Sequence, residues 1–202
     1  MQQIISQFLN DIHQTTWLEF IAVITGIASV IYSRKENILV YPVGLVSTGI
    51  FVLIYVEHGL YADASVNFYY TVMSIIGWMM WARKTDGKTS LSVTASSHKE
   101  WISSFAFFAG CWIVLYFLLS RFTDSVVPLA DSFTSAAAYT GMWLMNKKKL
   151  ENWIWWIITD LASVPLNFYK HLVFTSFQYL VFLILAVMGY ITWRKKTHHA
   201  AA

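Results

Sequence analysis

Residues 151–169 read ENWIWWIITDLASVPLNFY, and this stretch decides the fold class. As an α-helix it would rise about 28 Å, close to the ~30 Å thickness of the hydrocarbon core of a bilayer. Beyond Glu151 at its start, Asp160 is its only acidic or basic residue. A stretch of this length and apolar character predicts a transmembrane helix rather than a surface helix of a soluble domain.

One side of this predicted helix is polar and aromatic. At steps of three and four residues it carries Trp153, Trp156, Asp160, Ser163 and Asn167, whereas the opposite side is Ile, Leu and Val. Asp160 falls about midway along the helix, where its short side chain cannot reach water at either membrane surface. Because an acidic residue in hydrocarbon is disfavoured by roughly 2.5–3.5 kcal/mol, we expect Asp160 to face a cavity or a partner.

The rest of the chain repeats this pattern of long apolar stretches. Of the 202 residues, 57% are hydrophobic and only 12% are charged, with a mean hydropathy of +0.52. A soluble domain has about 25% charged residues. We therefore predict an all-α polytopic membrane protein embedded in a lipid bilayer. Its seven transmembrane helices are expected at residues 17–33, 38–56, 65–82, 101–120, 126–146, 151–169 and 172–193.

The basic residues predict how the chain is oriented in the membrane. If successive loops lie alternately on two sides, one side collects 12 of the 14 Lys and Arg residues, and the other side has only Arg121 and Lys170. Cytoplasmic loops are enriched in Lys and Arg, so we expect an external N-terminus, a cytoplasmic C-terminus and a location in the bacterial inner membrane. The 12 residues are Arg34, Lys35, Arg83, Lys84, Lys88, Lys99, Lys147, Lys148, Lys149, Arg194, Lys195 and Lys196.

Composition disfavours several other classes of protein. The net charge of +3 comes from residues in short loops, which indicates membrane topology rather than a nucleic-acid partner. The single cysteine, Cys111, lies in an apolar stretch, so we predict neither a disulfide framework nor a zinc cluster. The six His residues show no metal-ligand spacing within the predicted helices. The sequence shows no paired acid and base groups of the kind that would indicate an enzyme. We therefore expect neither catalytic residues nor a cofactor.

The first three and the last three predicted helices share short motifs. With a connecting helix between them, both triplets point the same way across the membrane, as in SWEET transporters, where substrate lies between such repeats. The predicted units are an external segment at 1–16, a first bundle at 17–84, a linker with the connecting helix at 85–125, a second bundle at 126–196 and a tail at 197–202. The matches are Thr25-Gly26 with Thr140-Gly141 and Glu36-Asn37 with Glu151-Asn152, both 115 residues apart. After a gap of three residues, Gly77 matches Gly189 and Trp81 matches Trp193, 112 residues apart.

Polar and aromatic residues of other helices predict a cavity between the triplets. Taken singly, Ser and Thr often only join neighbouring helices, and Trp or Tyr often only pack. Together, aromatic faces, amides and one carboxylate indicate a site for a flat, polar, cationic ring, which aromatic planes and a carboxylate both attract. Besides the helix at 151–169, the candidates are Tyr41 and Thr48 in helix 38–56, Asn67, Tyr70 and Ser74 in helix 65–82, and Gln178 in helix 172–193.

Two segments of the chain resemble the PnuC family of vitamin transporters. They are residues 33–81, SRKENILVYPVGLVSTGIFVLIYVEHGLYADASVNFYYTVMSIIGWMMW, and residues 151–182, ENWIWW followed by IITDLASVPLNFYKHLVFTSFQYLVF. The most specific part is the N-W-x-x-W motif formed by Asn152, Trp153 and Trp156, and we also expect Asn152 to bind substrate. The resemblance implies a SWEET-like fold of three, one and three helices, a homotrimer, and substrate contacts from Trp153, Trp156, Asn67 and Asp160.

The same resemblance implies uptake of nicotinamide riboside, or of thiamine in the closely similar PnuT branch. It also implies facilitated diffusion, with the vitamin trapped by a cytoplasmic kinase. The chain departs from the riboside carriers at Asn67, where Gln is expected, at Asp160, where Asn is expected, and at Ser74, where some relatives have Asn. These departures leave the two vitamins as alternatives, with the riboside favoured by its frequency in the family. A proton-coupled carrier in which Asp160 titrates and a membrane receptor are further alternatives.

Overall fold

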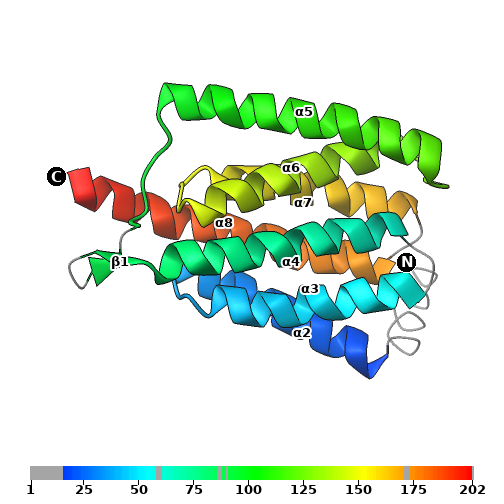
Figure 1. The fold of residues 1–202 in the computed structure, drawn as a ribbon, viewed down its shortest axis with the longest axis horizontal. Coiled ribbons are helices and arrows are strands. Elements are labelled where there is room, and N and C mark those ends of the chain that lie inside the picture. Colours follow the sequence, from blue (N-terminus) through cyan, green and yellow to red (C-terminus); the bar gives the residue numbers. More distant parts are fainter. Residues whose placement is uncertain (1–15, 58–60, 86–87, 90, 171–172, 202) are drawn as a thin grey trace.

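The computed structural model describes residues 16–57, 61–85, 88–89, 91–170 and 173–201, and the described residues form seven α-helices (Figure 1). All seven predicted helices are present, and their ends agree within four residues except that the last helix continues beyond residue 193. The helices are α2 (Trp17–Arg34), α3 (Val40–Glu57), α4 (Tyr61–Ala82), α5 (His98–Phe122), α6 (Pro128–Asn146), α7 (Asn152–Tyr169) and α8 (Val173–Ala201).

The described residues between α4 and α5 include regular structure. They contain a short antiparallel hairpin, β1 (Lys84–Thr85) with β2 (Lys88–Thr89), which the sequence did not predict. Further along, Thr94 pairs with the α6–α7 connection, where its N–H donates to Lys148 O (3.2 Å) and its carbonyl accepts from Leu150 N (2.9 Å). Helix α5 then begins at a capping box of Ser97 and Glu100.

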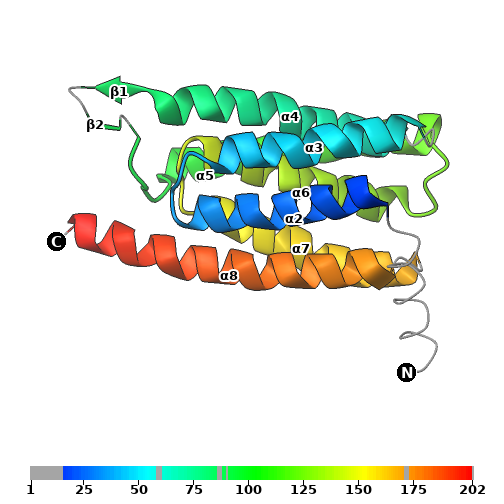
Figure 2. The same cartoon turned by 90° about the horizontal axis from the view of Figure 1, so that it is seen from below.

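The helices pack as two groups of three joined face to face. Helices α2, α3 and α4 contact one another in sequence order, as do α6, α7 and α8, and α5 packs on α6. The two triplets meet where α4 contacts α6 and where α2 contacts α8. Both triplets run in the same direction along the long axis (Figures 1 and 2). The sequence repeat and the likeness to SWEET transporters stay predictions.

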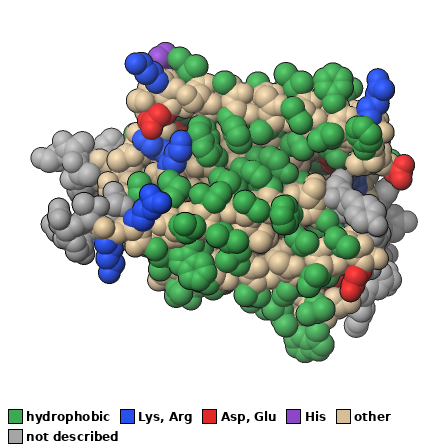
Figure 3. All heavy atoms as spheres, in the orientation of Figure 1, with side chains coloured by type: hydrophobic (Ala, Val, Ile, Leu, Met, Phe, Trp, Pro, Cys, Tyr) green, Lys and Arg blue, Asp and Glu red, His purple; other side chains and the backbone are tan. Residues whose placement is uncertain are grey.

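The outer surface is suited to lipid. Many large apolar side chains are exposed along the helices, and Figure 3 shows them spread over the middle of one face. Helices α2, α3, α5 and α8 are long and apolar enough to cross a membrane by composition alone. Helices α4, α6 and α7 have comparable lengths but carry more polar residues, several of which face inward.

The α2–α3, α4–α5 and α6–α7 connections and the C-terminal part of α8 lie at one end of the molecule, which we call the basic end (Figures 1 and 2). Two of these connections have the same backbone conformation, because Glu36 after α2 and Lys148 after α6 have φ values of 54° and 52°. These two residues are 112 positions apart, as are Trp81 and Trp193. The structure therefore relates the two connections at a spacing of 112 residues rather than the 115 inferred from the Glu-Asn motifs.

Gly77 permits a close approach of α4 to its neighbours, and we predict that Gly77→Ala destabilises the protein. An added Cβ would lie 2.2 Å from Oδ1 of Asn146 and 2.4 Å from the ring of Tyr41, and both of these side chains are fully buried. Overpacking of this kind lowers stability by about 1–3 kcal/mol. Thermal unfolding in detergent should show a lower midpoint.

The matched control for this prediction is Gly49→Ala in α3, where no atom lies within 4 Å of the added Cβ. Since alanine favours helix over glycine by roughly 1 kcal/mol, the midpoint of this variant should stay the same or rise. Equal midpoints for the two variants would contradict the close packing at Gly77.

Candidate functional site

A cavity of about 1050 Å³ lies between the two triplets. This volume is at the upper end of the ~300–1,000 Å³ typical of ligand pockets. Ten of the eleven residues predicted to bind substrate line it: Tyr41, Thr48, Asn67, Tyr70, Ser74, Trp153, Trp156, Asp160, Asn167 and Gln178. The helical spacing of polar residues was thus a sufficient guide to the wall of the cavity, whereas their role in binding stays a prediction.

The α7 wall of the cavity combines a carboxylate with aromatic rings. Asp160 is buried, and none of the described residues forms an ion pair with it. One turn earlier, Trp156 packs across Gly141 of α6, which leaves just enough space for the indole. Tyr70, from α4 of the other triplet, faces Trp156 with ring centroids 6.3 Å apart. Rings from both triplets therefore border the same space as the carboxylate.

The facing wall is formed by α3 and α4 and is polar. The hydroxyl of Thr71 contacts that of Thr48 (2.9 Å) and donates to the carbonyl of Asn67 (2.9 Å). This contact links the two helices, and it orients Thr48 at the cavity surface. Ser74 lies one turn further along α4 and is buried. This wall therefore offers hydroxyl and amide groups, which suit the hydroxyls of a sugar.

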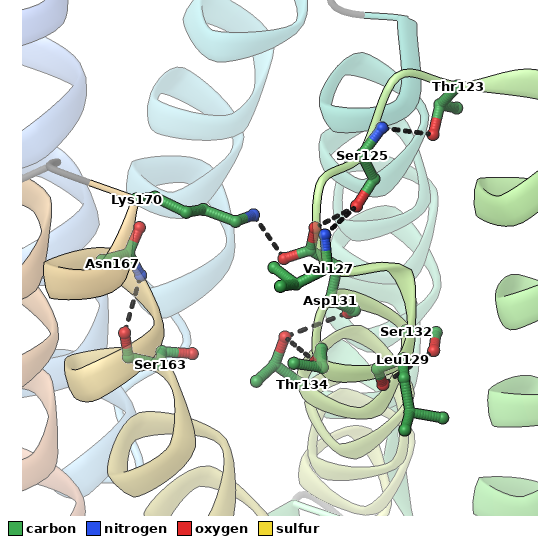
Figure 4. Close-up of polar contacts among 11 residues, drawn as sticks. Thr123, Ser125, Val127, Leu129, Asp131, Ser132, Thr134, Ser163, Asn167 and Lys170 are labelled. Atoms are coloured by element: carbon green, nitrogen blue, oxygen red, sulfur yellow. Dashed lines mark hydrogen bonds and ion pairs between the residues drawn. The ribbon is translucent and has the colours of Figure 1, made fainter.

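An ion pair, drawn in Figure 4, joins two residues of the cavity lining at the end of the molecule opposite the basic end. Lys170, at the C-terminal end of α7, reaches across to Asp131 in the first turn of α6. The second carboxylate oxygen of Asp131 accepts a hydrogen bond from Ser125 Oγ (2.6 Å). Both charged groups sit at favourable ends of the helix dipoles. Because Asp131 neutralises Lys170, the ammonium group of Lys170 adds no unpaired positive charge at this end of the cavity, which we call its mouth.

The cavity ends near the basic end on a layer of buried rings. Tyr41 and Trp153 border it there, and Trp81 and Trp193 lie beneath them, all four buried. The Tyr41 hydroxyl donates to Oδ1 of Asn146 (3.2 Å). No described residue of α4 beyond Ser74 lines the cavity. Among the described residues the cavity is therefore closed at this end, and its lining includes the exposed Asp124 at the other.

Some residues did not behave as the sequence suggested. Asn152 does not line the cavity, because its amide turns back to donate to Lys149 O (2.6 Å) at the start of α7. Trp78 follows Ser74 by one helical turn, so its spacing places it on the predicted polar face of α4, yet it is 41% exposed on the outside. Helix α2 also contributes Gly26, Ser29 and Ser33 to the cavity. These three recur at steps of three and four, but they are small and were not recognised as a face.

Within the part of the chain that the structure describes, no group of three or more His, Cys, Asp or Glu residues is placed to hold a metal ion. The three acidic residues that line the cavity, Asp124, Asp131 and Asp160, are carried by three different segments. The chemistry available in the cavity is therefore stacking, hydrogen bonding and attraction of positive charge.

A comparison with protein families identifies the family to which the chain belongs. The model of the nicotinamide mononucleotide transporter family matches residues 16–195, which include all seven helices of the structure except the end of α8. The chain belongs to this family. It is therefore a multi-pass membrane transporter and not an enzyme, and the resemblance to PnuC proteins drawn from the N-W-x-x-W segment is confirmed.

Individual relatives are distant in sequence but match over most of their length. The nicotinamide riboside transporter PnuC of Escherichia coli (strain K12) is 22% identical over 206 residues, which cover 90% of this chain and 86% of that protein. PnuC of Neisseria mucosa is 24% identical over 193 residues, covering 89% and 73%. The riboflavin/roseoflavin transporter RibM of Streptomyces davaonensis is 24% identical over 181 residues, covering 88% and 84%.

The fold is also that of a solved family member. A crystal structure of the vitamin B3 transporter PnuC superposes with a TM-score of 0.73 at 22% identity, covering 97% of this chain and 88% of that one. The seven-helix membrane fold is thereby shown. By name these relatives carry different vitamins, so the family establishes a vitamin transporter and the lining of the cavity must indicate which vitamin it carries.

Proposed function

We propose that this protein takes up nicotinamide riboside through the cavity between its triplets. The observation that supports this most is the position of Asp160, a buried carboxylate beside Trp156 and Tyr70. The pyridinium ring of the riboside is flat and cationic, so it stacks on aromatic faces and is attracted by a carboxylate. The hydroxyl-rich wall of α3 and α4 would receive the ribose.

The charge of the cavity favours the riboside over its phosphorylated form. The charged residues that line the cavity in the described part of the chain are Asp124, Asp131, Asp160 and Lys170. Lys170 is paired with Asp131, so the formal charge of the lining is −2, from three Asp and one Lys. A phosphate group would enter against this charge, and among the described lining residues the one cation, Lys170, is already paired.

The direction of transport follows from the topology that we propose. With the basic end in the cytoplasm, the mouth beside Lys170 faces outward and receives the vitamin. The family resemblance implies facilitated diffusion rather than proton coupling. Net uptake would then come from phosphorylation of the vitamin by a cytoplasmic kinase. The proposed assembly is a homotrimer.

Thiamine is the second candidate, because its thiazolium ring is also flat and cationic and meets the same carboxylate. Asp160 stands where riboside carriers are expected to have Asn. This difference favours a substrate whose recognition depends more on its positive charge than that of the riboside does. Riboflavin, named for the relative from Streptomyces davaonensis, is uncharged and gains nothing from Asp160. Its larger ring system would have to fit beside Trp156 without that attraction.

Uptake into liposomes containing the purified protein separates these proposals. We expect labelled nicotinamide riboside to equilibrate faster than thiamine or riboflavin, and to reach the same internal level with and without a pH gradient. Faster entry of thiamine would replace the proposed substrate. Accumulation above the external concentration, driven by a pH gradient, would replace facilitated diffusion by proton coupling.

A further inference from the structure

The closed end of the cavity is held by two indole hydrogen bonds that cross between the triplets. Trp81 of α4 donates from Nε1 to the carbonyl of Asn146, the last residue of α6 (3.1 Å). Trp193 of α8 donates from Nε1 to the carbonyl of Arg34, the last residue of α2 (3.1 Å). The third helix of each triplet therefore binds the C-terminal end of the first helix of the other.

The two hydrogen bonds occupy equivalent positions in the chain. Trp81 and Trp193 are separated by 112 residues, and so are Arg34 and Asn146. This is the spacing of Glu36 and Lys148, which contact each other directly. The two indoles also meet, with ring centroids 6.4 Å apart. The contact is thus reciprocal, and each half of it has a counterpart in the other triplet.

The rings above the two indoles show the same equivalence. Tyr41 meets Trp81 edge to face at 5.2 Å, and Trp153 meets Trp193 edge to face at 5.5 Å. Tyr41 and Trp153 are again 112 residues apart, and both border the cavity. The indole pair is therefore the layer that separates the cavity from the basic end.

Each crossing bond is suited to being broken and remade. The last carbonyls of a helix have no donor within the helix, so at Asn146 and Arg34 the indole serves an acceptor that water could serve instead. The bonds are neutral, and each depends on a single donor. Where transporters are built from helical repeats, access alternates as one repeat moves against the other. Such a movement at this end would separate both indoles from their carbonyls together.

A charged layer covers the indoles on the outside. Glu36, from the first triplet, forms ion pairs with Lys148 and Lys196 of the second. The Lys148 ammonium also lies 4.6 Å from the centre of the Trp81 ring. These contacts cross the same boundary as the indole bonds, so they add to the free energy that holds this end closed.

We infer that the Trp81–Asn146 and Trp193–Arg34 hydrogen bonds form a reciprocal latch that keeps the basic end of the cavity closed, and that both open together during transport. This role is independent of which vitamin is carried. The latch is tested by replacing each donor with phenylalanine, which keeps an aromatic ring but removes the N–H. In the Cys111→Ser background, Ser29→Cys in the cavity wall serves as the reporter.

The measurement is the rate at which a membrane-impermeant maleimide labels the reporter in vesicles that expose the basic end. Because one hydrogen bond contributes about 0.5–1.5 kcal/mol, we expect Trp81→Phe and Trp193→Phe each to raise this rate about two- to tenfold. The double variant should raise it by about the product of the two factors. Labelling in vesicles that expose the opposite end should not increase.

The control is Trp78→Phe, which removes an outward-facing indole from the same helix and should leave both labelling rates unchanged. Unchanged labelling from the basic end in both latch variants would overturn the inference, as would an equal increase with Trp78→Phe. If the tryptophan variants fail to fold, Glu36→Gln breaks the outer ion pairs without changing the buried rings. It should also raise labelling from the basic end, and an unchanged rate would again overturn the latch.

Discussion

Asp160→Asn should weaken binding of nicotinamide riboside by about 30- to 100-fold. The Asn side chain keeps the size of the Asp and its ability to accept a hydrogen bond, but it removes the negative charge that faces a cationic ring. Loss of one partner from a desolvated charge pair costs about 2–5 kcal/mol, and the open mouth of this cavity places the effect near the lower limit. Isothermal titration calorimetry of the purified variant measures it.

Two controls separate charge from structure in this experiment. Asp124→Asn removes a carboxylate at the exposed mouth of the cavity and should change affinity much less. The reduced, uncharged dihydropyridine form of the riboside should bind wild type and Asp160→Asn with similar affinity. Wild-type affinity of Asp160→Asn for the cationic riboside would show that Asp160 has only a structural role.

Trp156→Ala should weaken binding by about 1–3 kcal/mol, or roughly 5- to 150-fold, because it removes the ring on which the substrate would stack. The Trp156 ring lies against Gly141 on one side and faces Tyr70 across the cavity. Its removal would also widen the site. Titration followed by tryptophan fluorescence, with calorimetry as a second readout, measures the loss.

The conservative variant distinguishes stacking from simple filling of space. Trp156→Phe retains an aromatic face and should lose less affinity than Trp156→Ala. Trp78→Ala removes an exposed indole outside the cavity and should bind as wild type. If Trp156→Ala bound as tightly as wild type, stacking on this residue would be excluded.

The helices and most of the cavity wall could be predicted from the sequence. In a membrane both follow from the cost of placing polar groups in hydrocarbon. A polar group in hydrocarbon is disfavoured, so Asp160, Asn67 and Gln178 had to face inward wherever the helices placed them. The period of the helix then assigned their neighbours to the same face. The aromatic residues of α7 share that face, and Trp153 and Trp156 therefore line the cavity beside Asp160.

Other features depend on contacts between distant parts of the chain and could not be predicted. The α2 face of Gly26, Ser29 and Ser33 has small side chains that also occur where helices simply pack closely. Trp81 and Trp193 near helix ends are typical of membrane-interface residues, and only the structure shows that each binds the opposite triplet. Asn152 belongs to the most specific motif of the family resemblance, yet it stabilises the start of α7 instead of lining the cavity.

A structure of the protein with nicotinamide riboside in lipid nanodiscs would show whether a cationic vitamin binds between the two triplets. We predict that the pyridinium ring lies against Trp156, between α4 and α7, with its positive charge toward the Asp160 carboxylate and its ribose toward Thr48 and Asn67. Density for the riboside elsewhere on the protein, with the cavity free of ligand at saturating concentration, would exclude binding between the triplets.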